Sequence, residues 1–407
     1  MNIIFIEPSF PSNQREFVRA LHAAGANVIG IGERPREYLD AETKHWLSEY
    51  VQVASVVHEP SLLEAVRGIQ SKVWVDRIEA TVEAHIMPVA KVREATAIPG
   101  TSVKTAFLCR DKPAMKDALR NAGIPCAQST RARTPEDARA FADSVGYPLI
   151  VKPPDGAGAS GTFKLNSDGD LERVIIESGL ADGHAVAIEE FIEGHEGFLD
   201  TLTINGEVQH EFITHYFPNV LEAMRERWIS PQMVATNRID EPGYSEVREL
   251  ARKVIKALDI ETSATHMEWF FGPKGLKFSE IGCRPPGVGQ WDVYNAANDF
   301  DLYFEWACAL THGKVHTAPS RRYAAGMIAL RPDRDGHIVG YSGVEHVTQK
   351  YNDRIVAAHL PNPGTPTQPV EAGYMANAWL RVRHPDYDSL RHILNDIGET
   401  LKVHARG

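Results

Sequence analysis

The chain has 407 residues, 43% of them hydrophobic and 24% charged, which is the composition of an ordinary globular protein with room for two or three domains. Its net charge of −11 and the lack of any long Lys/Arg run argue against a general nucleic-acid binder. We also expect no signal peptide and no membrane span, because the apolar runs are too short.

The four cysteines are scattered. Cys109, Cys126, Cys283 and Cys308 include no Cys-x-x-Cys pair. This distribution favours free thiols in a reducing, cytoplasmic setting, and it implies neither a zinc site nor a disulfide.

Residues 1–100 alternate short apolar runs with helical patterns. The expected strands are 3–6, 28–31, 50–53 and 73–75, and the expected helices are 15–24, 61–69 and 79–95. Such alternation predicts a parallel sheet with helices on both faces. Because no Gly-x-Gly-x-x-Gly follows the first strand, a dinucleotide site is not indicated here, and we expect this region to supply part of a substrate pocket.

A boundary is expected at residues 98–100, and the next motif is a lysine-ended strand followed by glycines. Lys152 ends the strand, and Gly156, Gly158 and Gly161 formally match Gly-x-Gly-x-x-Gly. A dinucleotide loop must open a helix, whereas residues 162–166 have the pattern of a strand. The motif therefore predicts a glycine flap whose backbone can approach phosphates; a plain mobile glycine turn is the alternative.

The following segment is expected to contain mainly strands. A strand at 186–192 precedes a hairpin formed by 198–204 and 207–214 over Asn205-Gly206, a favoured two-residue turn. Residues 215–240 show no clear periodicity and carry His215, Arg225 and Arg227. Because a loop this long is usually functional or disordered, we expect these side chains to form a substrate wall, in which arginine suits a free carboxylate. A helix is expected at 244–258.

Residues 265–284 contain a predicted β-hairpin that is central to the expected function. Two apolar runs flank Gly272-Pro-Lys-Gly275, which predicts a β-hairpin with a three-residue loop and Gly275 in the left-handed conformation. In that register Gly272 faces Leu276 and Phe270 faces Phe278.

The same register places Glu268 opposite Glu280 on one face of the sheet. Like charges directly opposite each other are destabilising, and a divalent cation would remove the conflict. Carboxylate oxygens suit Mg²⁺, which also keeps waters and substrate phosphates among its ligands. Two solvated surface glutamates are the alternative, but the strands around them are strongly apolar.

A helix is expected at 295–310, and from about residue 316 the sequence changes to short β-strand patterns. Short strands are then expected at 324–330, 337–341, 344–347, 355–358 and 376–382, with a closing helix at 389–403.

The ordered set of Lys112, Lys152 with its glycine flap, residues 189–192, and Glu268…Glu280-x-x-x-Arg284 resembles the ATP-grasp superfamily, specifically its carboxylate–amine ligases of the L-amino acid ligase type. The resemblance covers the whole chain. It implies an α/β fold with an α+β central region: a doubly wound parallel-sheet pre-ATP-grasp domain (1–100), an ATP-grasp domain (101–315) and a small β-rich C-terminal domain (316–407).

The resemblance also implies a role for each matching residue. The ATP phosphates would be held by Lys112, Lys152, Gly156, Gly158, Ser160 and Gly161. The adenine and ribose would meet Glu189, Glu190, Phe191, Ile192 and Glu196, with Glu189 at the adenine amino group and Glu196 at the ribose hydroxyls. Glu268 and Glu280 would hold Mg²⁺, with Mn²⁺ as the alternative ion. Arg284 would stabilise an acyl phosphate, so that Arg284, Lys152 and Glu280 form the catalytic set.

The implied reaction joins a carboxylic acid and an amine, releasing ADP and phosphate, in a cytoplasmic homodimer. Substrate residues would be His215, Arg225, Arg227 and Arg284, while Trp291 and Tyr294 would either line the same cavity or pack in the core. Many relatives have Asn two residues after the second metal-binding Glu, whereas this chain has Gly282, so its second ion would be held less completely. The alternatives are an acyl kinase that stops at the phosphorylated product and a silent ATP-binding regulatory module.

Overall fold

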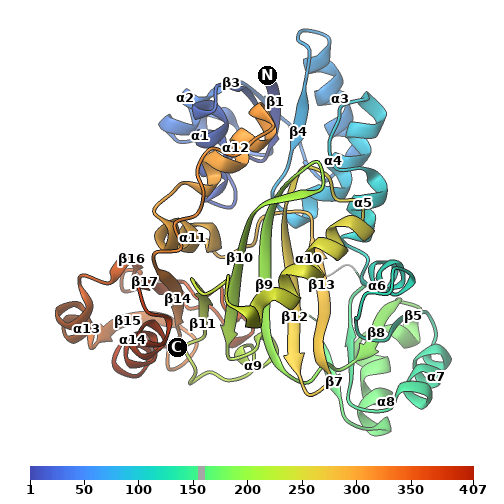
Figure 1. The fold of residues 1–407 in the computed structure, drawn as a ribbon, viewed down its shortest axis with the longest axis vertical. Coiled ribbons are helices and arrows are strands. Elements are labelled where there is room, and N and C mark those ends of the chain that lie inside the picture. Colours follow the sequence, from blue (N-terminus) through green and yellow to red (C-terminus); the bar gives the residue numbers. More distant parts are fainter. Residues whose placement is uncertain (155–160) are drawn as a thin grey trace.

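The computed structural model describes residues 1–154 and 161–407. The predicted phosphate-binding residues Gly156, Gly158 and Ser160 lie outside the described residues. A small N-terminal sheet, a long central sheet and a second small sheet beside it are the main layers, and the C-terminal segment continues the long sheet (Figure 1).

Four parallel strands form the N-terminal sheet. Their order is β3 (Leu47–Gln52), β2 (Asn27–Gly32), β1 (Asn2–Ile6) and β4 (Arg77–Glu79). Ile3 and Phe5 pack toward α1 (Gln14–Ala23), while Ile4 and Ile6 pack toward α3 (Glu59–Gln70) and α4 (Glu83–Thr96). Both faces of β1 are thus covered, which explains its unbroken apolar run and confirms the doubly wound parallel sheet.

Some of the expected boundaries in this region are wrong. The fourth strand is Arg77–Glu79 rather than 73–75, and α4 begins at Glu83 rather than 79. The apolar run at 73–75 resembled a strand, but the strand position is decided by pairing, and β1 pairs with β4 from Ile3 opposite Arg77. The helix α2 (Ala41–Trp46) was not expected; the side chain of Asp40 accepts the N–H of Thr43 at its start.

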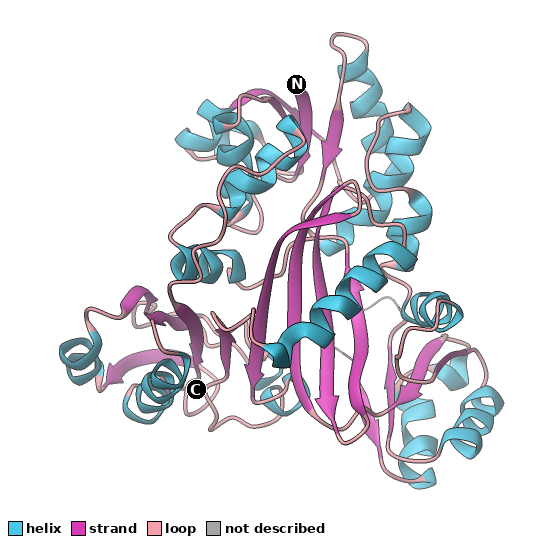
Figure 2. Ribbon diagram, in the orientation of Figure 1, coloured by secondary structure: helices cyan, strands magenta, loops and turns pink. Residues whose placement is uncertain are grey.

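The strands before and after the predicted glycine flap belong to a small sheet ordered β5 (Ser129–Ala132), β8 (Val186–Glu190), β6 (Leu149–Lys152) and β7 (Phe163–Leu165). Strands β6 and β7 are antiparallel neighbours, so the two strands predicted on either side of the undescribed residues are confirmed. Helices α7 (Pro135–Val145) and α8 (Asp168–Glu177) flank this sheet (Figure 2). Thr134 and Asp137 form a capping box at the start of α7.

The long sheet has eight strands and continues into the C-terminal segment. Its order is β13 (Gly275–Gly282), β12 (Ser263–Gly272), β9 (His195–Ile204), β10 (Glu207–Phe217), β11 (Gln232–Ala235), β14 (Ala324–Leu330), β17 (Ala378–His384) and β16 (Ile355–His359). Helix α10 (Ser245–Ala257) crosses one face of this sheet (Figure 1). The opposite face packs against α11 (Gln290–Asn298) and α12 (Leu302–His312).

The β12–β13 hairpin pairs Glu268 with Glu280 as predicted, but through a different register near the turn. Gly272 pairs with Gly275, so the expected pairs of Gly272 with Leu276 and of Phe270 with Phe278 are wrong. A bulge at Ser279 then adds one residue to β13 and restores the pairing of the two glutamates. Gly275 has φ +77°, which confirms the left-handed position.

Residues 215–240 are more ordered than the sequence indicated. Strand β10 continues to Phe217, α9 (Val220–Ala223) follows, and β11 joins the sheet by pairing with β10 and β14. The expectation of one long loop is therefore wrong, because the β-pairing partners of these residues are distant in sequence.

The helix expected at 295–310 is in fact two helices. Asp299 has φ +52°, and the side chain of Asp301 accepts the N–H of Phe304 at the start of α12. Further along, residues 344–347 begin α13 (Val344–Tyr351) rather than a strand. The chain closes with α14 (Tyr387–Thr400) and with β18 (Lys402–Arg406), which pairs with β15 (His337–Ser342).

Two further helices connect the N-terminal sheet to the central region: α5 (Val103–Leu108) and α6 (Lys112–Asn121). Among the residues that the structure describes, no helix is long and apolar enough to cross a bilayer.

Candidate active site

A cleft of about 1540 Å³ lies between the small sheet, the long sheet and the N-terminal region. It is lined by most of the residues that the sequence singled out: Lys112, Lys152, Glu189, Glu190, Phe191, Ile192, Glu196, Arg225, Glu268, Glu280 and Arg284. These come from segments far apart in the chain, so it is the fold that brings the predicted set together.

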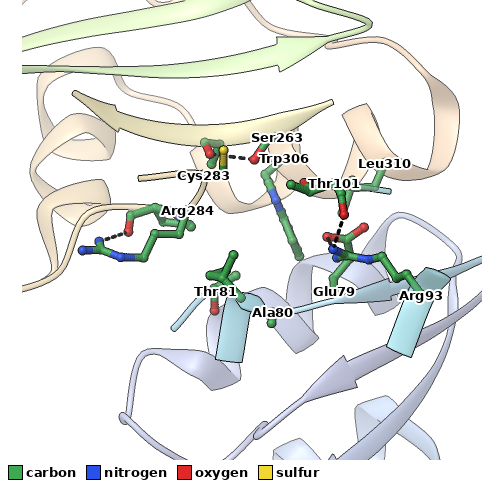
Figure 3. A pocket seen from close by; sticks show the side chains of 13 residues that line it. Glu79, Ala80, Thr81, Arg93, Thr101, Ser263, Cys283, Arg284, Trp306 and Leu310 are labelled. Atoms are coloured by element: carbon green, nitrogen blue, oxygen red, sulfur yellow. Dashed lines mark hydrogen bonds and ion pairs between the residues drawn. The ribbon is translucent and has the colours of Figure 1, made fainter. Parts of the chain in front are cut away.

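A much smaller cavity, of about 20 Å³, lies between the N-terminal sheet and the long sheet (Figure 3). It is lined by Glu79 and Arg93 on one side and by Cys283 and Arg284 on the other. That volume holds about one water molecule. The large cleft is therefore the candidate active site.

Glu280 meets the two predicted phosphate-binding lysines. Its Oε2 lies 3.4 Å from the Nζ of Lys112, at the start of α6, and 3.8 Å from the Nζ of Lys152, at the end of β6. Burial would raise the pKa of Glu280, but the ammonium groups of Lys112, Lys152 and Lys116 outweigh it and lower that pKa to about 2. The carboxylate therefore stays charged at neutral pH.

Lys116 is a site residue that the sequence reasoning missed. It is fully buried one turn after Lys112 on α6, and its ammonium contacts the carboxylate of Glu189. Burial and the neighbouring charge of Lys152 lower the pKa of Lys116 well below its ordinary value. The signal was available, since helix positions four residues apart share a face.

Glu189 lies in the cleft wall beside two lysines. Its buried carboxylate contacts the ammonium groups of both Lys116 and Lys152. Its role at an adenine amino group therefore stays a prediction.

The other predicted adenine residues line an apolar end of the cleft. Phe191 carries the Nζ of Lys164 3.7 Å from its ring centroid, and Glu190 pairs with Lys274. Ile192, Ile150 and Phe270 line the same cleft.

Glu196 lies beside the metal-ligand candidates. Its Oε2 accepts the N–H of Val220 at 2.7 Å, at the start of α9. Burial, together with the nearby charge of Glu268, raises the pKa of Glu196 to about 8. The resemblance assigned this residue to ribose hydroxyls, and its position in the cleft wall leaves that role a prediction.

His266 and Asp200 are two further site residues that the sequence reasoning missed, and they lie next to Glu268. His266 Nδ1 lies 2.7 Å from Asp200 Oδ1, and His266 Nε2 lies 3.7 Å from Glu268 Oε1. Burial would lower the pKa of His266, but Asp200 and Glu268 outweigh it and raise that pKa to about 9. Tyr294 donates a hydrogen bond to the second oxygen of Asp200.

These residues fit a magnesium ion with bound phosphates. Glu268 and Glu280 are paired across two strands, and the carboxyl of Glu196 lies close enough to Glu268 for its ionisation to be suppressed. Mg²⁺ takes only one or two protein carboxylates when substrate phosphates and waters complete its shell. The lysines beside Glu280 supply donors for those phosphates.

Arg284 lies in the cleft wall next to the N-terminal region. Its Nε pairs with Glu83 at the start of α4, and its Nη1 donates to the carbonyl of Pro285 at 2.8 Å. A Cβ at Gly282 would lie 3.4 Å from Arg284 Cγ, which is ordinary van der Waals contact, so the position of Arg284 does not require a glycine there.

The far end of the cleft contains an ion pair from the C-terminal segment. Arg381 Nη2, on β17, lies 2.8 Å from Asp292 Oδ2 on α11, and the guanidinium stacks 4.4 Å from the Trp379 ring centroid. The apolar residues Tyr216, Met233, Met327 and Tyr374 line the same part. No local pattern indicates a site role for Arg381, because β17 follows the predicted catalytic motifs at a long separation in the chain.

The predicted substrate wall is only partly present. Arg225 lines the cleft, but Arg227 pairs with Asp335 away from it. His215 faces the α10 side of the sheet, where its ring nitrogens contact His195 and Tyr244. Its expected place in the cleft is therefore wrong, because successive residues of a strand point to opposite faces and Tyr216 takes the cleft side. Burial lowers the pKa of His215 to about 3.

The two aromatic candidates on α11, Trp291 and Tyr294, both pack in the core. Tyr294 is fully buried and stacks on Phe212 with ring centroids 4.3 Å apart, which fits the core-packing alternative. Trp291 also packs in the core, against Phe17. The α11 residues that line the cleft are Gln290 and Asp292.

Comparison with known proteins gives a consistent picture. Residues 117–299 match the ATP-grasp domain family. An L-arginine-specific L-amino acid ligase of Bacillus subtilis is 30% identical over 252 residues, which cover 60% of each chain. Alanine–anticapsin ligase of Bacillus subtilis (strain 168) is 26% identical over 230 residues, which cover 52% of this chain and 48% of the relative. The matches thus span between about half and three-fifths of these relatives.

The crystal structure of an L-amino acid ligase from Bacillus licheniformis has the same fold. It superposes with a TM-score of 0.78 at 17% identity, covering 100% of this chain and 99% of that one.

Proposed function

We propose that this chain, in which residues 117–299 match the ATP-grasp domain family, belongs to the ATP-grasp superfamily and is an ATP- and Mg²⁺-dependent ligase. It joins the carboxylate of one small molecule to the amine of another, with release of ADP and phosphate. The observation that carries the proposal is the position of Glu280, whose carboxylate lies between Lys112 and Lys152 on one side and its strand partner Glu268 on the other.

The lysines and the carboxylates divide the binding of Mg-ATP between them. Lys112 and Lys152 donate to phosphate oxygens, while the ion pair between Glu189 and Lys152 fixes the position of the Lys152 ammonium. Glu268 and Glu280 would hold Mg²⁺, which neutralises the charge on the β- and γ-phosphates when it is bound.

The first chemical step is attack by a carboxylate oxygen of the acid on the γ-phosphorus of ATP. The bond from the β,γ-bridging oxygen to the γ-phosphorus breaks, so that ADP leaves and an acyl phosphate forms. Arg284 is the cleft residue placed for the charge that develops on the transferring oxygens, and its pairing with Glu83 holds it there.

The second step is attack by the amine nitrogen on the acyl carbon, which forms the amide and expels phosphate. An acyl phosphate hydrolyses in water, so the step requires a closed site. The cleft is walled by the N-terminal region, both sheets and the C-terminal segment, and β6 and β7 contribute Ile150, Lys152 and Lys164 to its lining.

We further propose that the substrates are amino acids or similar zwitterions. The cleft beyond the lysines offers charges of both signs in two pairs, Glu83 with Arg284 and Asp292 with Arg381. An ammonium and a carboxylate on one small molecule are complementary to such pairs. The apolar residues beside Arg381 provide space for a side chain.

The test is phosphate release from ATP and Mg²⁺ with a matrix of amino-acid pairs. We expect ADP and phosphate in equal amounts with one dipeptide-like product, and only when both substrates are present. Turnover with the acid alone to a stable acyl phosphate would identify the acyl kinase, whereas AMP and pyrophosphate would exclude the proposed chemistry. Size-exclusion chromatography with light scattering tests the accompanying expectation of a homodimer, and cell fractionation tests that of a cytoplasmic location.

A further inference from the structure

The end of α12 carries a cluster of sulfur and nitrogen side chains outside the cleft. Cys308 and His312 are one helical turn apart on α12, and His316 follows on the segment after the helix. One potential ligand atom from each lies within 4.8 Å of the other two. Among residues 1–154 and 161–407, these are the only three His, Cys or carboxylate side chains that bring their potential ligand atoms this close together.

The spacing inside the cluster suits a metal ion. His312 Nδ1 and His316 Nε2 are 3.2 Å apart. Two nitrogen ligands at about 2.0–2.1 Å from a tetrahedral ion are separated by roughly 3.3 Å. The thiol of Cys308 is buried on the inner side of the pair, while both imidazoles reach the surface, so an ion has a route in from solvent.

A buried carboxylate holds His316 in this position. Glu305 is 2% exposed, and its two oxygens accept the backbone N–H groups of His316, at 2.6 Å, and Thr317, at 3.0 Å. Burying a carboxylate is costly unless hydrogen bonds satisfy it. Glu305 lies about one helical turn before Cys308 on α12. Its two hydrogen bonds therefore hold the segment after the helix against α12.

We propose that Cys308, His312 and His316 bind a zinc ion, with water as the fourth ligand. One thiolate and two neutral imidazoles form a donor set of borderline softness, which favours Zn²⁺ over Mg²⁺. Binding forms one Zn–S and two Zn–N bonds and releases the thiol proton to solvent. The three ligands have the spacing Cys-x-x-x-His-x-x-x-His, a signal that a search for Cys-x-x-Cys pairs does not detect.

The ion would join two parts of the structure. Helix α12 is tied to α1 by the ion pair between Asp301 and Arg19, 2.7 Å apart. The segment after His316 leads to β14, the first C-terminal strand of the long sheet. Because none of the three ligands is among the described residues that line the cleft, the zinc site is separate from the magnesium site.

The experiment uses the full chain, freed of metal by a chelator and kept in excess Mg²⁺ so that the carboxylates of the cleft are occupied. Co²⁺ is titrated as a spectroscopic substitute, followed by displacement with Zn²⁺. We expect one equivalent of Co²⁺ to give a thiolate-to-metal absorption band that Zn²⁺ abolishes. His316→Gln should weaken Zn²⁺ binding by at least about 100-fold, since loss of an outer partner alone costs 10–100-fold.

His392→Gln is the matched control, because it replaces an exposed histidine on α14. It should bind zinc as the unaltered chain does. Cys308→Ser should lose the absorption band, and because a buried change risks misfolding, His316→Gln carries the test if that variant fails to fold. A Co²⁺ complex without a thiolate band, or equal Zn²⁺ affinity in the His316 and His392 variants, would overturn the proposal.

Discussion

His266 on β12 lies directly opposite Asp200 on β9, and the Nδ1 of the imidazole is 2.7 Å from the carboxylate oxygen. The other ring nitrogen faces Glu268, the first proposed metal ligand, at 3.7 Å. A charged histidine thus occupies the space behind the magnesium site, and it ties the ligand carboxylate to the rest of the sheet.

We expect the stability of the metal-free protein to depend on His266 between pH 6.5 and 9. The folded-state pKa of about 9 exceeds the ordinary value of 6.5, so the protonated ring favours the folded state. Its stabilisation is complete below pH 6.5 and is lost as the pH rises through 9. Urea denaturation at pH 6 and pH 9 should show a smaller decrease for His266→Gln than for the unaltered chain. Equal decreases would refute the assignment.

Substitution of two neighbouring glutamates should change stability in opposite directions. Glu280 has its pKa lowered to about 2, so Glu280→Gln should destabilise the metal-free protein at pH 7 by about 2 kcal/mol. Glu196 has its pKa raised to about 8, so the folded state opposes its ionisation, and the penalty grows as the pH rises from 4.5 to about 8. Glu196→Gln should therefore stabilise by ~2 kcal/mol at pH 7.

Urea denaturation at pH 7 in a chelator measures both changes. The same two variants should both weaken binding of Mg-ATP, measured by calorimetry. Two changes of the same sign in stability would contradict the charge arrangement described for the cleft.

Glu189 should be more important for holding lysines than for recognising a base. Glu189→Gln leaves the ammonium groups of Lys116 and Lys152 without their carboxylate, which we expect to cost about 3 kcal/mol of stability and to raise the KM for ATP. In the double variant with Lys116→Met the loss should be smaller than the sum of the single losses, because one buried cation has been removed with it. A change of preference from ATP to GTP in Glu189→Gln, with stability unaltered, would instead support the adenine contact.

Arg284 should affect the chemical step. Arg284→Met removes the guanidinium from the cleft, and we expect kcat to fall by about 10²–10³-fold, as for loss of one preorganised donor. Binding of ADP should be unchanged, because Lys112 and Lys152 remain. Phosphate release and ADP calorimetry separate the two effects. A loss of ADP affinity equal to the loss of kcat would show a structural role only.

Arg381 should determine the affinity for an amino-acid substrate. Arg381→Met removes the cation that pairs with Asp292 at the far end of the cleft, and we expect the KM for one substrate to rise by at least about tenfold, with the KM for ATP unchanged. Arg383→Met is the control, since Arg383 lies on the same strand but pairs with Asp299. If both variants have the same kinetics, Arg381 does not contact substrate.

The sequence by itself determined the elements whose signals are local. The apolar run of β1, the cap at Thr134 and the turn at Asn205-Gly206 each depend on neighbouring residues, and all three are present in the structure. The pairing of Glu268 with Glu280 was also predictable, although the route to it was not, because the bulge at Ser279 compensates for a tighter turn.

The tertiary structure alone decided which side chains meet across the cleft. Lys116 with Glu189, His266 with Asp200, and Arg381 with Asp292 come from elements that are distant in the chain. Their contact depends on strand order and on which face of a strand each residue occupies. A one-residue shift in register exchanges those faces, so local patterns carry too little information to place such pairs.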